Sequence, residues 1–155
     1  MRRTLPLVGA LVALSFGVPA FAQDAQARLW DAAIAGDTLV IRRAIDDGAS
    51  IDSLDTRRNP NGRRALNWAA WHDRVAAIEL LIALGAPLEA ENRTGFSPLH
   101  HAAEAGSIAS VRALLDAGAD PTHANKDGIR PGWNKYECPR CGATWTRKLK
   151  AKETA

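Results

Sequence analysis

The sequence predicts an all-α solenoid of about three helix-turn-helix units, followed by an irregular C-terminal tail. Two landmarks recur together along the chain of 155 residues. Gly-Ala pairs begin at Gly48, Gly85 and Gly118, with spacings of 37 and 33 residues. Ala-Ala pairs recur with the same spacings, at 32–33, 69–70 and 102–103. Self-similarity at a fixed period of about 33 residues indicates stacked supersecondary units.

Each unit is expected to contain two short helices, and their limits are clearest in the third unit. Ser97 is suited to cap the first helix, from Leu99 to Ala105, with Pro98 in its first turn and Gly106 as its stop. The second helix is expected from about Ile108 to Ala117, and Gly118 ends it. Apolar residues at helical spacing mark its buried face in all three units: Val111, Leu114 and Leu115; Ile78, Leu81 and Ile82; Ile41, Ala44 and Ile45.

The connection between the first two units is four residues longer than the next one. The additional residues fall between Ser53 and Asn61, in a segment rich in Asn, Pro and neighbouring Gly. Such residues are typical of loops, where an insertion costs little free energy. We therefore expect a longer loop at this point and unchanged helices on either side of it.

This pattern resembles the ankyrin repeat. The family's Thr-Pro-Leu-His-x-Ala-Ala motif corresponds to Ser-Pro-Leu-His-His-Ala-Ala at 97–103, and its paired leucines and Gly-Ala follow at 114–115 and 118–119. The middle unit is degenerate in this motif, with Arg-Ala-Leu-Asn at 64–67, and the first unit lacks it and looks like an N-terminal cap. The resemblance covers residues 27–125.

The resemblance implies a repeat domain over residues 23–125, with units at about 27–52, 59–90 and 92–123. The register continues to Pro131, which lies 33 residues after Pro98, but Gly132 stands where leucine is needed. A fourth unit is therefore not expected. Because solenoid units bury their faces only against neighbours, the outer face of the third unit needs cover from residues 124–150 or from a partner.

The first 22 residues have the features of a bacterial-style secretory signal peptide. Arg2 and Arg3 precede an uncharged apolar run from Leu5 to Val18, and Ala-Phe-Ala at 20–22 supplies a small-residue cleavage site. The run is short for a hydrocarbon layer of about 30 Å. We expect cleavage before Gln23, no membrane anchor in the mature chain, and a periplasmic or secreted location.

The charge of the chain is uneven, although the net charge is only +3. Residues 23–123 carry a net charge of −4, whereas residues 124–155 carry +5. A basic tail on an acidic body indicates two segments with different roles. We assign residues 126–155 to an irregular basic tail, and we do not expect a secreted chain to bind nucleic acid with it.

The tail contains both cysteines of the chain, Cys138 and Cys141. Their Cys-Pro-Arg-Cys-Gly segment resembles one knuckle of a zinc ribbon. Tetrahedral zinc needs four ligands, so His123 or a second chain would have to complete a site. A disulfide or a pair of thiols fits the same residues. A zinc-linked assembly is therefore the alternative function, and the sequence implies no other cofactor.

The resemblance also places the variable positions that line the concave groove and the hairpin tips. They are Asn61, Arg63, Trp68, Trp71, His72, Arg93, Phe96, His101 and Glu104. Aromatic and arginine side chains are frequent anchors of interfaces. Trp68 and Trp71 lie three residues apart on one helix face, and at least one of them is expected to pack between units. His101 is expected on the concave side, available to a partner or solvated.

The adjacent histidines do not indicate a metal or catalytic site. Side chains of neighbouring helical residues point about 100° apart, so His100 and His101 cannot hold one metal from one face. By resemblance, His100 hydrogen-bonds the backbone between units. The sequence contains no Gly-x-Ser-x-Gly, phosphate-binding glycine loop or His-Glu-x-x-His motif. We therefore predict a non-enzymatic protein-binding module whose partner the sequence does not identify.

Overall fold

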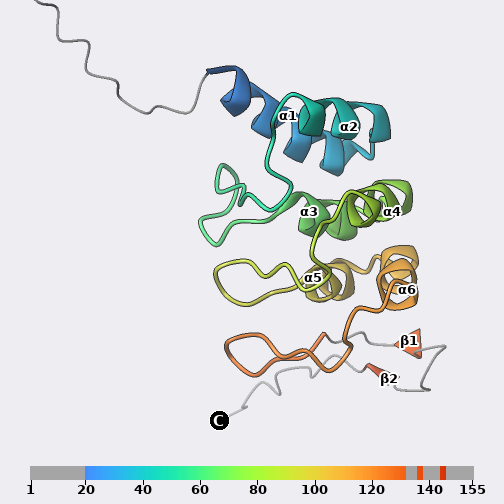
Figure 1. Ribbon diagram of the computed structural model, residues 1–155. Coiled ribbons are helices and arrows are strands. Elements are labelled where there is room, and N and C mark those ends of the chain that lie inside the picture. Colours follow the sequence, from blue (N-terminus) through green and yellow to red (C-terminus); the bar gives the residue numbers. More distant parts are fainter. Residues whose placement is uncertain (1–19, 132–135, 138–143, 146–155) are drawn as a thin grey trace, which may run out of the picture.

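The repeat solenoid is present as predicted in the computed structural model, which describes residues 20–131, 136–137 and 144–145 (Figure 1). The described residues form three helix pairs and one short pair of strands. The helices are α1 (Ala20–Ala35), α2 (Thr38–Asp46), α3 (Ala65–Trp71), α4 (Val75–Ala83), α5 (Pro98–Ala105) and α6 (Ile108–Asp116). The strands β1 (Tyr136–Glu137) and β2 (Thr144–Trp145) are antiparallel and lie in the tail, after the repeats.

The units stack along one axis, so that like elements form rows. Figure 1 shows the first helices α1, α3 and α5 in one row, the second helices α2, α4 and α6 in another, and the hairpins projecting beyond the first row. The core lies between the two helix rows, where Leu29, Ile41, Leu66, Ile78 and Leu114 are at most 1% exposed. We call the surface formed by the first helices and the hairpin tips the inner face.

The helix limits follow from the capping residues. Ser97 has extended backbone angles and accepts a hydrogen bond from the His100 amide, Pro98 begins α5, and Gly106 ends it with a left-handed φ of 87°. All three roles confirm the prediction. The corresponding stop of α3 is Asp73, whose φ of 57° is unusual for a residue with a side chain. Its Oδ1 accepts bonds from the Ser110 amide and hydroxyl at 2.8 and 2.9 Å, which offsets the strain.

The first helix is longer than the repeat pattern predicts. It begins at Ala20 rather than near residue 27, and Ala25 is completely buried. Gln26 exchanges two hydrogen bonds with the backbone of Ser50, which holds the additional turns against the end of the first unit. The predicted leader, residues 1–22, otherwise lies outside the described residues.

Three hairpins of the same design follow the three helix pairs, and the first two of them connect successive units. An amide–carbonyl bond closes each one: Asp55 N–H to Arg63 O, Asn92 N–H to Phe96 O, and Asn125 N–H to Ile129 O. Asp55 lies eight residues before its partner, whereas the two asparagines lie four before theirs. The insertion of four residues is therefore confined to the first hairpin, as predicted.

Gly95 is the hairpin glycine with the closest neighbouring atoms. A Cβ atom at Gly95 would lie 2.6 Å from the Lys126 backbone nitrogen, and its φ of 82° disfavours a side chain. Gly128 has a similar φ of 72° in the next hairpin, but a Cβ there would contact nothing within 4 Å. Substitutions at these two glycines therefore distinguish the effect of steric contact between hairpins, expected at Gly95 only, from the effect of backbone strain, expected at both.

We predict that Gly95→Ala lowers the free energy of unfolding by about 2–4 kcal/mol, and Gly128→Ala by about 1–2 kcal/mol. The first change adds a collision between neighbouring hairpins, whereas the second adds only the left-handed strain. Urea unfolding followed by circular dichroism measures both values. Equal losses in the two variants would show that the hairpins do not pack as described.

Candidate protein-binding surface

One equivalent position of each first helix hydrogen-bonds the chain that follows the unit, although the residue at this position differs in every unit. His100 Nε2 lies 2.8 Å from Ile129 O, and Asn67 Nδ2 donates to Ala90 O at 3.1 Å. In the first unit, Trp30 Nε1 donates to Ser53 O at 3.2 Å. The structural role predicted for His100 is confirmed, and the unit that looked degenerate performs the same function with asparagine.

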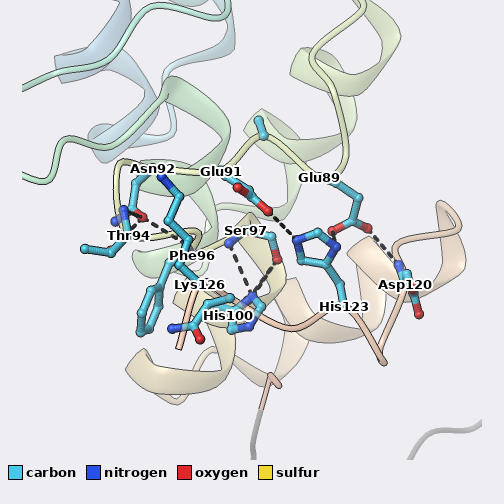
Figure 2. A network of polar contacts seen from close by, with 12 residues as sticks. Glu89, Glu91, Asn92, Thr94, Phe96, Ser97, His100, Asp120, His123 and Lys126 are labelled. Atoms are coloured by element: carbon cyan, nitrogen blue, oxygen red, sulfur yellow. Dashed lines mark hydrogen bonds and ion pairs between the residues drawn. The ribbon is translucent and has the colours of Figure 1, made fainter. Parts of the chain in front are cut away.

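His100 belongs to a wider polar network on the third unit (Figure 2). Its Nδ1 lies 2.8 Å from Ser97 Oγ, and burial is the main cause that lowers the pKa of the ring from 6.5. His123 Nε2 lies 2.7 Å from Glu91 Oε1, and the Asp120 amide donates to Glu89 Oε1 at 2.8 Å (Figure 2). These contacts give His123 a structural role in joining the third unit to the hairpin before it.

No cluster of metal ligands is present within residues 20–131. No three His, Cys, Asp or Glu side chains gather there in a way that could hold a metal ion. Cys138 and Cys141 lie outside the described residues, so the zinc and disulfide alternatives stay predictions.

His101 does not face a groove, and the expectation that it is available to solvent or a partner is wrong. It is 3% exposed, and neither ring nitrogen has a hydrogen-bond partner. The ring packs against Trp71, at 6.1 Å between centroids, and against Phe96 at 5.7 Å. Burial, with smaller effects of Arg63 and His100, lowers its pKa to about 3, so the ring is neutral at pH 7.

Trp68 is also buried, and the expectation that it lies open in the groove is wrong for this residue. It is 5% exposed, and its Nε1 donates to Asp55 Oδ2 at 3.1 Å. Trp71, one helical turn later, is only partly buried. The expectation that one of the two tryptophans packs inside is therefore confirmed, and the inner one is Trp68.

Asp55 is the completely buried acceptor at the base of the long hairpin. Its carboxylate accepts from Trp68 Nε1, from the Arg57 amide at 3.0 Å and from Arg57 Nε at 2.8 Å. Burial raises the pKa of this carboxyl, but the hydrogen bonds and charge of Arg57 outweigh it, so the pKa lies below 3.8. Arg57 also pairs with Asp31 at 3.0 Å and lies 4.9 Å from the centroid of the Trp30 ring.

An arginine lies over the tryptophan pair. The guanidinium carbon of Arg63 is 4.6 Å from the Trp68 ring centroid and 4.1 Å from that of Trp71. Contacts of this kind contribute about 0.5–2 kcal/mol each. Burial lowers the pKa of Arg63, and the charge of Glu104 opposes that change. His72 stacks on Trp68 at 5.9 Å and its pKa is also lowered, first by burial and then by nearby arginines.

The remaining predicted residues occupy the hairpin tips and the open end of α5. Asn61, Arg93 and Glu104 are exposed, and Phe96 is partly buried. The Arg93 amide donates to Asn61 O at 2.9 Å, and its Nη1 donates to Pro60 O at 2.7 Å. The structure thus brings Arg63, Trp68, Trp71 and His72 together, whereas Arg93 and Asn61 form the adjoining edge of the inner face.

The sequence analysis did not identify four residues whose hydrogen bonds hold the hairpins in place beside this surface: Trp30, Asp55, Arg57 and Asn67. A repeat alignment contains the signal for two of them, because Trp30 and Asn67 occupy the position of His100 in their own units. For Asp55 the signal is its register with Asn92, which lies 37 residues later. Nothing in the sequence pairs Asp55 with Trp68, because that contact depends on the path of the inserted loop.

The outer surface has a shallow cleft of about 550 Å³ between α4 and α6. It is lined by Asp73, Val75, Glu79, Ile108, Ala109, Arg112, Ala113 and Asp116. It gathers no aromatic side chain, which distinguishes it from the inner face. None of the helices within the described part of the chain is long and apolar enough to span a membrane.

Comparison with known proteins agrees with this architecture. Residues 29–125 match the family model of ankyrin repeats in three copies. The chain is 37% identical over 84 residues to palmitoyltransferase AKR1 of Lachancea kluyveri, covering 54% of this chain and 11% of that protein. It is 38% identical over 79 residues to protein phosphatase 1 regulatory subunit 27 of Mus musculus, covering 51% of each.

A third relative is ankyrin repeat and SOCS box protein 3 of Homo sapiens, 32% identical over 103 residues, which cover 64% of this chain and 19% of that protein. The chain thus spans about half or less of the length of these relatives. Their shared feature is a repeat scaffold, and such scaffolds generally mediate protein–protein interaction. The chain belongs to the ankyrin-repeat family.

Proposed function

We propose that the protein is a non-enzymatic module that binds another protein through its inner face. The partner would contact the surface over α3 and α5 together with the tips of the hairpins at 55–63 and 92–96. Binding of this kind needs no reaction at the site, because a rigid, preformed surface loses little entropy when a partner docks.

The observation that carries the proposal is the cluster of Arg63 and Trp71 on the inner face. Tryptophan and arginine are enriched among the few residues that contribute most of the binding energy of protein interfaces, where neighbouring residues exclude water. Here both side chains are held before any partner arrives, by the ring contacts of Arg63 and by the packing of Trp71 against His101. A partly buried tryptophan beside a fixed cation is therefore a preorganised anchor.

We also propose that this binding takes place outside the cytoplasm, in the periplasm or after secretion. The support is the sequence of residues 1–22, with its basic start, uncharged apolar run and small-residue site. A cell-fractionation experiment with the full-length chain tests this part independently. Recovery of the unprocessed chain in the cytoplasm would contradict it.

Affinity capture tests the binding proposal. The tagged chain is used as bait in an envelope extract, beside the double variant Arg63→Ala/Trp71→Ala and the single variant Arg42→Ala. Arg42 is an exposed arginine of α2, away from the inner face, so it controls for lost charge. We expect the double variant to lose the partner while its helical content is unchanged. Equal recovery by all three baits would refute the assignment of the inner face.

Trp71 rather than Trp68 is the residue to change in that experiment. Because Trp68 is 5% exposed and its indole nitrogen bonds Asp55, replacing it would disturb the fold. Loss of binding in a Trp68 variant would therefore not distinguish a lost contact from a damaged scaffold.

A further inference from the structure

The inner edge of the molecule carries cations that successive hairpins hold in a row. Arg93 Nη1 donates to Pro60 O at 2.7 Å, and Lys126 Nζ donates to Arg93 O at 2.8 Å. In both cases the bond joins residues that are 33 apart, which is one repeat. Each cation thus reaches back to the backbone of the preceding hairpin, and this contact restricts where its charge lies.

Arg63 lies beside these two cations but at a different position of its own repeat, the one that Phe96 occupies in the next unit. The Arg93 amide is bonded to Asn61 O, only two residues before Arg63 along the chain. Arg63 is half-buried, and its Nε is shielded from solvent without a hydrogen-bond partner. A desolvated guanidinium gains more from a carboxylate than a solvated one, because it has already lost part of its hydration.

The ion pairs of the neighbouring side chains separate two groups of cations. Arg57 and Arg58 on the first hairpin tip are paired with Asp31 at 3.0 and 3.5 Å. Within the described ranges, no carboxylate lies within 4 Å of the charged groups of Arg63, Arg93 or Lys126. Glu104 acts on Arg63 only at longer range, through its charge. The positive charges of these three residues, which we call the basic row, are therefore available to pair with an anionic ligand.

The spacing of the row suits one kind of ligand. Packed helices lie about 8–10 Å apart, so Arg93 and Lys126, which are equivalent residues of successive units, are offset by a similar distance. A polyproline II segment advances about 3.1 Å per residue and returns to the same side every three residues, or about 9 Å. Carboxylates three residues apart in such a segment would therefore meet Arg93 and Lys126, with Arg63 beside them.

We propose that the basic row of Arg63, Arg93 and Lys126 binds an acidic, polyproline II-like segment of a partner protein that carries a carboxylate at every third residue. This rests on the proposed function and names the class of partner. Charge complementarity supports a short acidic segment over nucleic acid. The body of the chain, residues 23–123, has a net charge of −4, which opposes a long polyanion but has less effect on a ligand that contacts the row alone.

Fluorescence anisotropy with the full chain tests the proposal. The probe is a labelled synthetic peptide in which single glutamates alternate with pairs of prolines. The comparison peptide has the same composition with its glutamates adjacent to one another. We expect the first peptide to bind more tightly, and its affinity to fall as salt is added.

Matched variants assign the binding to the row. We expect Arg63→Ala and Arg93→Ala each to weaken binding of the alternating peptide about tenfold, and Arg42→Ala to leave it unchanged. Arg93 is exposed, so its variant tests the row even if Arg63→Ala lowers stability. No binding of the peptide, equal binding of both peptides, or tighter binding of a single-stranded oligonucleotide would each overturn the proposal.

The peptide and capture experiments distinguish failure of the acidic-segment proposal from failure of the proposed function. If the peptide does not bind but Arg63→Ala/Trp71→Ala still abolishes capture of a partner, the acidic segment is refuted and the protein-binding function stands. If that double variant captures the partner as well as the parent chain does, the proposed function itself fails.

Discussion

Asp55→Ala is expected to lower the free energy of unfolding by about 3 kcal/mol. The change removes the buried acceptor of Trp68 Nε1 and leaves that indole N–H without a partner. It also removes the carboxylate that holds Arg57 over the long hairpin. Urea unfolding of the full chain, followed by the helical signal in circular dichroism, measures this loss of stability.

Asp31→Ala is the matched control, because Asp31 pairs with the same arginine from an exposed position. Its side chain is 52% exposed, and surface ion pairs contribute about 0–1 kcal/mol.

Asp55→Asn should give an intermediate loss. The asparagines at 92 and 125 show that an amide oxygen can bond the hairpin backbone, but an amide nitrogen cannot accept from Trp68. A loss from Asp55→Ala no larger than that from Asp31→Ala would contradict the buried role of Asp55.

The pH dependence of the Asp55 contribution has a definite sign. Because its folded-state pKa lies below 3.8, the unfolded chain binds this proton more readily. The stabilisation is therefore complete above the ordinary aspartate pKa and is lost as the pH falls below 3.8 through the folded-state pKa. Near neutral pH the difference between the parent chain and Asp55→Ala should not change with pH.

His101→Leu is expected to stabilise the protein, by about 1 kcal/mol at pH 7 and by about 3 kcal/mol at pH 5. At pH 7 the gain comes from replacing a buried ring whose two nitrogens have no partner with an apolar side chain. The additional gain at low pH follows from the folded-state pKa of about 3, against 6.5 for an ordinary histidine. Each pH unit between these two values changes the stability by about 1.4 kcal/mol.

The sign follows from proton binding. Below pH 6.5 the unfolded chain takes up a proton at residue 101 that the folded chain does not, so the stability of the parent falls as the pH falls. His100 and His72 also have lowered pKa values, but both are present in the parent and the variant, so their effects cancel in the difference. Urea unfolding of both proteins at pH 7 and pH 5 measures it. A difference that does not grow towards pH 5 would show that His101 is not buried as described.

The repeat architecture could be predicted because each of its determinants is local. The stops at Gly106 and Gly118, the cap at Ser97 and the apolar positions of α6 all lie within one unit, and the period then repeats them. The same locality limits the prediction for the inner face. The pattern identifies the face of α5 on which His101 lies. How deeply the His101 side chain is buried depends on its contacts with Phe96 and Trp71, which belong to other elements.

Trp68 shows the same limit more clearly. Its helix position predicts a surface that faces the groove, yet Trp68 is buried and its indole nitrogen donates to Asp55 in the long hairpin. The path of a loop with an insertion is not encoded in the repeat period. Conversely, Asn67 departs from the family motif, although its amide makes the cross-unit bond that the motif histidine makes in the third unit.

The proposed binding surface is the inner face rather than the outer helices. Hydrogen exchange of the backbone amides, measured with and without the partner recovered by affinity capture, tests it most directly. We expect slower exchange in the hairpins at 55–63 and 92–96 and in α3 and α5, with α4 and α6 unchanged. Protection confined to α4 and α6, around the cleft lined by Glu79 and Ile108, would contradict it.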